Sequence, residues 1–88
     1  MRVHEITVPK DLQANDLQTV AQQASRFRSA VTLKLEEEQI VLDAKSMLGM
    51  MLMQIRGGTR LLIQTKGSDE EEALDAMCEL LERLPLKS

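Results

Sequence analysis

The sequence is poor in the residue types that most often bind large ligands. It has no tryptophan or tyrosine and a single phenylalanine, so it lacks the aromatic platforms on which nucleic-acid bases stack. Its 11 basic and 14 acidic residues give a net charge of −3, so the excess positive charge that neutralises phosphates is also missing. We therefore expect no direct nucleic-acid partner.

Residues that bind metals or form disulfides are scarce as well. The chain has one cysteine, Cys78, and one histidine, His4. A single cysteine forms no internal disulfide, and this pair does not make a usual zinc ligand set, so we predict no metal and no cofactor. Cys78 falls on the apolar stripe of a predicted helix, where we expect an inert thiol. His4 falls inside a predicted strand, where we expect a structural role.

Long apolar runs are absent too. No run approaches the roughly 18 residues of a membrane span, and the start "MRVHEITVPK" lacks the apolar core of a signal peptide. We therefore predict no membrane association and a cytoplasmic location. A chain of 88 residues without repeats or linkers leaves room for one small core, so we expect a single domain over residues 1–88 that is not an enzyme.

What the sequence does have is a clear succession of periodic segments. Apolar and polar residues alternate as in strands over residues 2–8, 31–35, 40–42 and 59–65. The acidic segment "EEEQ" between the second and third of these predicts a hairpin. Pro9 closes the first strand.

Three helices are predicted between and after these strands. Leu17, Val20, Ala21, Ala24 and Phe27 have the spacing of one amphipathic face. For the N-terminal cap of this helix the sequence offers two candidates, Asn15, with Gln18 three residues later, and Asp16.

The last helix is predicted within "KGSDEEEALDAMCELLERLP". Ser68 and Glu71 form a Ser-x-x-Glu capping box, and acidic residues occupy the first turn. Pro85 is expected to end the helix. The predicted buried stripe consists of Leu74, Met77, Cys78 and Leu81.

The middle helix is short and rich in methionine. Ser46 opens this helix, and the Ser46 hydroxyl is expected to cap it. The glycines at 57 and 58 end any helical stretch. Four methionines lie on this segment, Met47, Met50, Met51 and Met53. Because so short a helix buries only part of its surface, we predict one or two of them in the core. The rest, with Leu48, would form an exposed docking patch.

The order strand, helix, strand, strand, helix, strand, helix predicts the α+β class. Four antiparallel strands with all helices on one face would bury one side of each element and form an open-faced β-sandwich.

This order, together with "DAKSMLGMM" and "GGTRLLIQTKGSDEEEALDAM", resembles the HPr family of the bacterial sugar phosphotransferase system. The most specific part is the "KS-x-x-G" segment from Lys45 to Gly49. The resemblance covers nearly the whole chain and implies the HPr-like open-faced β-sandwich.

One family signature is altered. The loop that reads Gly-x-His-Ala-Arg-Pro-Ala in the family corresponds to residues 11–17, with Gln13 in the place of the histidine and Asn15 in the place of the arginine. The family histidine accepts a phosphoryl group from enzyme I. Because an amide is a poor nucleophile and Asn15 offers no charged fork to phosphate, we expect no catalytic residue and no phosphorelay through this loop.

Retention of the serine without the histidine resembles the catabolite-repression type of HPr protein. This implies phosphorylation of Ser46 by HPr kinase/phosphorylase, followed by binding to a catabolite-control repressor. It also implies a partner-binding surface, formed by Met47, Leu48, Met51, Gln13 and Asn15. The predicted function is a regulatory or adaptor protein.

Two other functions stay open at this point. One is a phosphoryl carrier that uses His4 or another residue. The other is a protein-binding or dimerisation module that needs no phosphorylation, with Ser46 as a helix cap only. Both a monomer and a homodimer are compatible with the sequence.

Overall fold

The computed structural model describes residues 1–83, and its centre is one antiparallel sheet in the order β1-β4-β2-β3. β1 (Arg2–Thr7) pairs with β4 (Arg60–Lys66), β4 with β2 (Ala30–Leu35), and β2 with β3 (Ile40–Asp43). A turn at residues 36–39 joins β2 to β3, as the acidic segment predicts.

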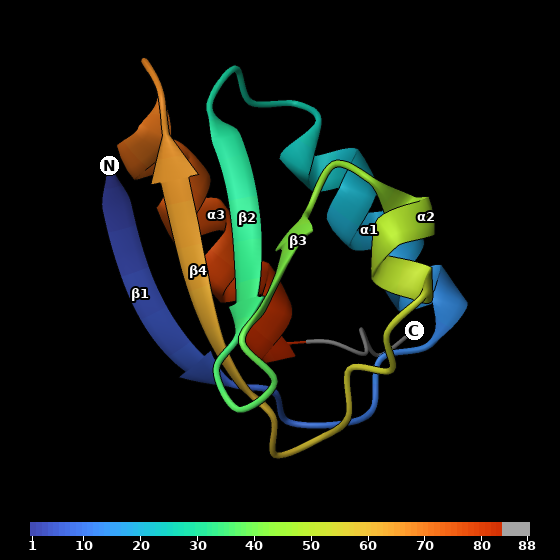
Figure 1. The fold of residues 1–88 in the computed structure, drawn as a ribbon. Coiled ribbons are helices and arrows are strands. Elements are labelled where there is room, and N and C mark those ends of the chain that lie inside the picture. Colours follow the sequence, from blue (N-terminus) through green and yellow to red (C-terminus); the bar gives the residue numbers. More distant parts are fainter. Residues whose placement is uncertain (84–88) are drawn as a thin grey trace.

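Three helices cover one face of this sheet and leave the other face to solvent (Figure 1). They are α1 (Ala14–Ala24), α2 (Met47–Met51) and α3 (Glu70–Arg83). α3 packs against β1, β4 and β2, whereas α2 packs against β3 and α1. The predicted α+β open-faced sandwich is confirmed. None of the helices in the described part of the chain is long and apolar enough to span a membrane.

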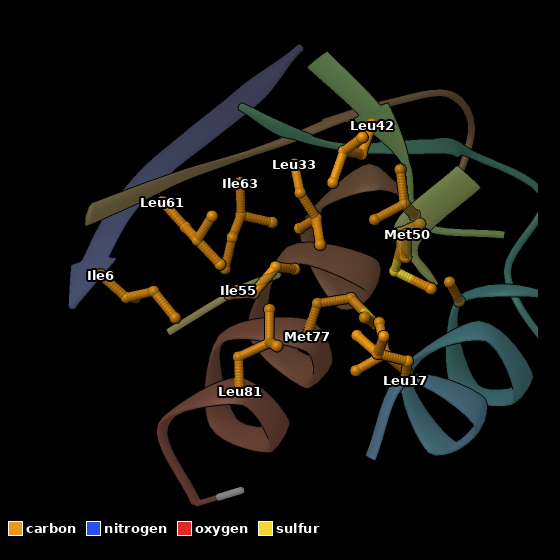
Figure 2. Close-up of a cluster of buried hydrophobic side chains, with 14 of the residues drawn as sticks. Ile6, Leu17, Leu33, Leu42, Met50, Ile55, Leu61, Ile63, Met77 and Leu81 are labelled. Carbon is orange, nitrogen blue, oxygen red and sulfur yellow. The ribbon is translucent and has the colours of Figure 1, made fainter. Parts of the chain in front are cut away.

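The core lies between the sheet and the helices. Every second residue of β2 and β4 points into it, because side chains alternate along a strand, and Leu33, Leu61 and Ile63 are fully buried there. Met77 and Leu81, one helical turn apart on α3, meet them from the other side (Figure 2). The apolar residues that alternate along the strands and those that recur at each turn of α3 therefore form a single apolar layer.

The predicted stripe of α3 is half right. Met77 and Leu81 are buried, but Leu74 and Cys78 are only half-buried, and Ala73 takes a buried position instead. The stripe is narrower than expected because the face of α3 turned to the sheet is centred on residues 73, 77 and 81. Burial, with Glu82 and Asp75 nearby, raises the pKa of the Cys78 thiol to about 11. Pro85, expected to end this helix, lies outside the described residues.

The predicted cap of α1 is wrong. The helix begins at Ala14, so Gln13 is the N-cap residue rather than Asn15 or Asp16. Asp16 instead turns its carboxylate back, and Oδ2 accepts a hydrogen bond from the Gln13 backbone N–H at 2.8 Å. This is the reciprocal half of a capping box, which satisfies a backbone donor at the helix start and explains why Asp16 is buried.

The predicted capping box of α3 is also wrong. α3 begins at Glu70, which places Asp69 rather than Ser68 directly before the helix. The Asp69 carboxylate accepts hydrogen bonds from the backbone N–H of Arg28 at 3.0 Å and of Ser29 at 2.9 Å, and also from the Ser29 hydroxyl. The start of α3 is therefore tied to the chain between α1 and β2. We call these contacts, together with Gly67, the α3 clamp.

Candidate functional site

Ser46 is the N-cap residue of α2, as the sequence predicts. Its side-chain Oγ accepts a hydrogen bond from the Gly49 backbone N–H at 3.2 Å, and the residue is half-buried. A Cβ atom at position 49 would lie only 3.3 Å from Ser46 Oγ, so glycine leaves this oxygen more room than any other residue would. Ser46 thus has a structural role whether or not it is modified.

The residue before Ser46 ties this segment to the rest of the molecule. The Lys45 ammonium donates to the Phe27 carbonyl oxygen at 2.9 Å, and the Lys45 backbone N–H donates to Asp43 Oδ1 at 2.9 Å. Because Phe27 lies in the connection after α1, this lysine joins the start of α2 to the end of α1. This contact of Lys45 was not predicted from the sequence.

The methionines of α2 divide between the core and the surface, as predicted. Met50 is fully buried and points into the apolar layer (Figure 2), whereas Met51 is 51% exposed. Met47 and Met53 are half-buried. Leu48 is 75% exposed, so the expected apolar patch is present on the surface.

One further member of this patch was not predicted. Leu52, the residue after α2, is 79% exposed. It lies four residues after Leu48, which is the spacing that places two side chains on one side of a helix. That spacing is visible in the sequence and could have identified it.

Gln13 and Asn15 are exposed at the start of α1. Gln13 lines a small hollow with neighbours from the preceding loop and from the segment between α2 and β4, namely Asp11, Leu12, Gln54, Ile55 and Arg56. Two hydrogen bonds hold the loop against that segment: the Gly57 N–H donates to Asp11 Oδ1 at 2.7 Å, and the Leu12 N–H to the Ile55 carbonyl at 2.9 Å.

The predicted site residues lie on one pair of helices but not at one point of it. α1 and α2 pack against each other beyond the β3 edge of the sheet (Figure 1). The start of α2 lies beside the end of α1, where Lys45 contacts Phe27, whereas Gln13 at the start of α1 lies beside the segment after α2. The amides of Gln13 and Asn15 donate and accept hydrogen bonds but carry no charge. Among residues 1–83, no group of three His, Cys, Asp or Glu side chains is arranged to hold a metal ion.

His4 lies elsewhere. It is exposed on β1, opposite Ile63 of β4 in the strand register, and β1 is the sheet edge farthest from β3. Because α2 packs against β3, His4 is separated from the α1 and α2 helix starts by the width of the sheet.

Comparison with known proteins agrees with this geometry. The family model described as the PTS HPr component phosphorylation site matches residues 2–83. The chain belongs to the HPr family. The family and the fold that the sequence resemblance predicted are therefore confirmed.

Both HPr proteins and HPr-like Crh proteins are similar to this chain. The HPr-like protein Crh of Halalkalibacterium halodurans is 30% identical over 79 residues, which covers 90% of this chain and 92% of the relative. An HPr of Thermoanaerobacter tengcongensis has a crystal structure with a TM-score of 0.84 at 28% identity, covering 94% of this chain and 93% of that one.

A crystal structure of Crh from Bacillus subtilis is also similar. Its TM-score is 0.75 at 29% identity, with 99% of this chain and 98% of that chain covered. That protein is described as a dimer with swapped domains. The HPr fold is thus shared with both phosphocarrier and Crh proteins.

Proposed function

We propose that this HPr-family chain is a regulatory protein of carbon catabolite control, switched by phosphorylation of Ser46 and not a carrier of phosphohistidine. The observation that carries the proposal is the pair of helix starts. Gln13 is the N-cap residue of α1, where the resemblance to the family implies the active histidine, whereas Ser46 is the N-cap residue of α2.

The chemistry of Gln13 argues against phosphorelay. A phosphocarrier needs a nucleophile whose lone pair attacks phosphorus, and the lone pair of an amide nitrogen is delocalised into the carbonyl. The only histidine of the sequence, His4, lies on β1, at the opposite edge of the sheet from β3 and α2. We therefore propose that enzyme I does not use this chain as a phosphoryl acceptor.

Phosphorylation of Ser46 would change the surface rather than the fold. HPr kinase/phosphorylase would transfer the terminal phosphoryl group of ATP to Oγ, with release of ADP. The product carries about −1.5 to −2 charge at the start of α2, the helix that exposes Leu48 and Met51. A phosphoserine oxygen is still an acceptor for the Gly49 N–H, so the helix start need not open.

The proposed partner of the modified form is a catabolite-control repressor, which would read the phosphate together with the apolar patch. Such a partner gains from two kinds of contact. Leu48 and Met51 supply apolar area that is already exposed, and the phosphate supplies charge-assisted hydrogen bonds. In this proposal the chain itself catalyses nothing.

A second candidate function is a binding module that is independent of phosphorylation. It is favoured by one observation: Ser46 is half-buried, and its Oγ already accepts the Gly49 N–H. A hydroxyl occupied in this way is a sufficient reason for a serine at position 46.

The intact mass of the chain separates these functions. We expect a gain of one phosphate after incubation with HPr kinase/phosphorylase and ATP, and no gain in Ser46→Ala. Ser68→Ala is the matched control, because Ser68 is an exposed serine before another helix, and it should be phosphorylated like the parent.

Two outcomes would contradict the proposal. No gain of phosphate in the parent would favour the phosphorylation-independent module. A phosphoryl group transferred from phosphoenolpyruvate by enzyme I would show that the chain is a carrier, and His4→Gln would then test whether His4 holds the group.

A further inference from the structure

Basic residues gather where α1 ends and α2 begins. The Lys45 ammonium is bound to the Phe27 carbonyl oxygen at 2.9 Å, and the chain neighbours of Phe27 are Arg26 and Arg28. Figure 1 shows the connection from β3 to α2 passing this end of α1. Because Ser46 follows Lys45 directly, three cationic residues lie near the proposed phosphorylation site. We call Arg26, Arg28 and Lys45 the basic cluster.

Both arginines of the basic cluster are turned to solvent. Phe27 between them is half-buried and packs against the core, whereas Arg26 and Arg28 are exposed. The backbone of Arg28 is fixed, because its N–H donates to Asp69 Oδ2 at 3.0 Å. Within residues 1–83, no member of the basic cluster forms an ion pair with another residue of that range. No carboxylate of the described chain therefore neutralises these charges by direct contact.

Two carboxylates lie in the same region. One is Asp43 of β3, whose Oδ1 accepts the Lys45 backbone N–H, and the other is Asp69, which is bound at the start of α3. The elements packed against α2 are β3 and α1. α2 has no charged residue, and the one charged residue of α1, Asp16, lies in its first turn, at the other end of that helix. Positive charge therefore prevails around Ser46, although the net charge of the chain is −3.

We propose that Arg26 and Arg28, together with Lys45, stabilise the doubly charged phosphate on Ser46. This inference rests on the proposed function, because it concerns the phosphorylated form. A phosphoserine loses its second proton with a pKa of about 6, and nearby positive charges favour the dianion and lower that pKa. Arginine suits this role because its planar guanidinium stays charged and donates in pairs to phosphate oxygens. The modified serine would then carry its full charge near neutral pH.

Both arginines are near enough to act on a charge at Ser46. Each is one residue from Phe27, and Ser46 is one residue from Lys45, so about 3.8 Å between Cα atoms separates each from a member of the 2.9 Å contact. The guanidinium groups can therefore come within about 10 Å of Ser46, the range over which charges act at about 0.1 M salt. A unit charge about 8 Å away in water changes an acid dissociation constant about 2–3-fold.

Titration of the phosphoserine, followed by phosphorus NMR of the phosphorylated chain, tests the inference. Arg26→Gln/Arg28→Gln removes both arginine charges and leaves polar side chains in their place. We expect the second acid dissociation constant of the phosphate to fall about 3–6-fold in this variant at low salt, and by a smaller factor at high salt.

The matched control for this titration is Lys34→Gln/Arg60→Gln. Both residues lie on the side of the sheet that faces away from the helices, because they alternate with the buried residues of β2 and β4. This variant has the same net charge as the arginine variant. Its phosphate should titrate as that of the parent does.

A second titration separates this inference from the proposed function. Ser46→Asp places a carboxylate at the same position without any kinase, and the carboxyl group titrates in NMR. Adding Arg26→Gln/Arg28→Gln should lower the acid dissociation constant of this carboxyl group about 2–4-fold at low salt, whereas the control pair should leave it unchanged. A chain that the kinase does not phosphorylate would contradict the proposed function, but this titration would still decide whether the basic cluster stabilises an anion at position 46.

Two results would overturn the inference. One is a phosphoserine, or a carboxyl group in Ser46→Asp, that titrates in the same way with and without the two arginines. The other is an equal change in the control pair, since the effect would then come from the net charge of the chain and not from the basic cluster.

Discussion

α2 and α3 begin in different ways. The start of α2 is capped locally, by a hydroxyl that reaches three residues along its own chain, from Ser46 to Gly49. The start of α3 is held at long range, because Asp69 accepts three hydrogen bonds from Arg28 and Ser29, about 40 residues away. A local cap can be modified without disturbing other elements, whereas a long-range clamp joins elements that must stay together. The start of α2 also has a long-range contact, from Lys45 to the Phe27 carbonyl, but the Ser46 cap itself is local. We therefore expect changes at the Ser46 cap to cost less stability than changes at the α3 clamp.

The α3 clamp should be the most sensitive point of the fold. Gly67 has φ of +152°, and a Cβ atom there would lie 2.6 Å from Ser29 Cα. We expect Gly67→Ala to lower the free energy of unfolding by on the order of 4 kcal/mol, through backbone strain and overlap with main chain. Gly58→Ala is the control: its φ is +86° but nothing lies nearby, so about 1–2 kcal/mol is expected. Equal losses in urea unfolding would contradict the clamp.

Adjacent methionines of α2 should differ as strongly as core and surface do. Met50→Ala removes a fully buried side chain and should cost about 2–5 kcal/mol. Met51→Ala changes a side chain that is 51% exposed and should cost less than about 0.5 kcal/mol. Both free energies are measured by urea unfolding of the protein. Because both variants replace methionine by alanine in the same helix, the change in helix propensity is the same. A similar cost at the two positions would show that α2 is not anchored as described.

The α3 clamp should also affect how the stability of the protein depends on pH in acid. Hydrogen bonds from the Ser29 hydroxyl and the Arg28 N–H lower the pKa of Asp69 from its ordinary value of 3.8 to about 2. Because the folded state lowers this pKa, the carboxylate stabilises the fold above pH 3.8, and that stabilisation is lost as the pH falls to about 2. We expect Asp69→Asn to be less stable near neutral pH and to lose less stability than the parent over this range.

Asp75→Asn is the control for this acid experiment. Asp75 is an exposed carboxylate on the same helix, so this variant removes one acid group without touching Ser29. Its stability should follow the pH dependence of the parent in urea unfolding. Parallel curves for Asp69→Asn and the parent would mean that the clamp adds no pH dependence.

The local cap of α2 should contribute less to stability than the α3 clamp. Ser46→Ala removes the acceptor of the Gly49 N–H and should cost about 1 kcal/mol. Ser46→Asp replaces it with another good cap and should leave the stability within about 0.5 kcal/mol of the parent. If Ser46→Asp unfolds the protein, a phosphate at this position would not be a change of surface alone.

The order of elements and the exposed patch on α2 followed from local patterns. Alternation along β2 and β4 and the spacing along α1 and α3 reflect which side of each element faces the core, and these patterns are written in consecutive residues. Ser46 was predicted as a cap because its bond to Gly49 is local. The patch followed from counting apolar residues on a helix too short to bury them.

The predicted caps of α1 and α3 were wrong because a distant contact or an unusual cap residue sets the start of each helix. Ser68 and Glu71 have the spacing of a capping box, but the start of α3 is set by Asp69, whose partner Ser29 is 40 residues away. At α1 the cap is Gln13, which is not a preferred cap residue, and the side chain of Asp16 accounts for the helix start. The contact of Asp69 is not visible in a local pattern. The contact of Asp16 has the local spacing of a capping box, but Gln13 gives no signal of a cap.

The strand order sets a limit on when this protein folds during its synthesis. β4 lies between β1 and β2 and pairs with both, although it is the last strand along the chain. A nascent chain that has not yet released Lys66 from the ribosome holds only the β2–β3 hairpin, with β1 unpaired. Because these long-range pairings form only once β4 is available, the sheet closes late. The four-stranded sheet is therefore completed only after β4 has been translated, whichever strand emerges first.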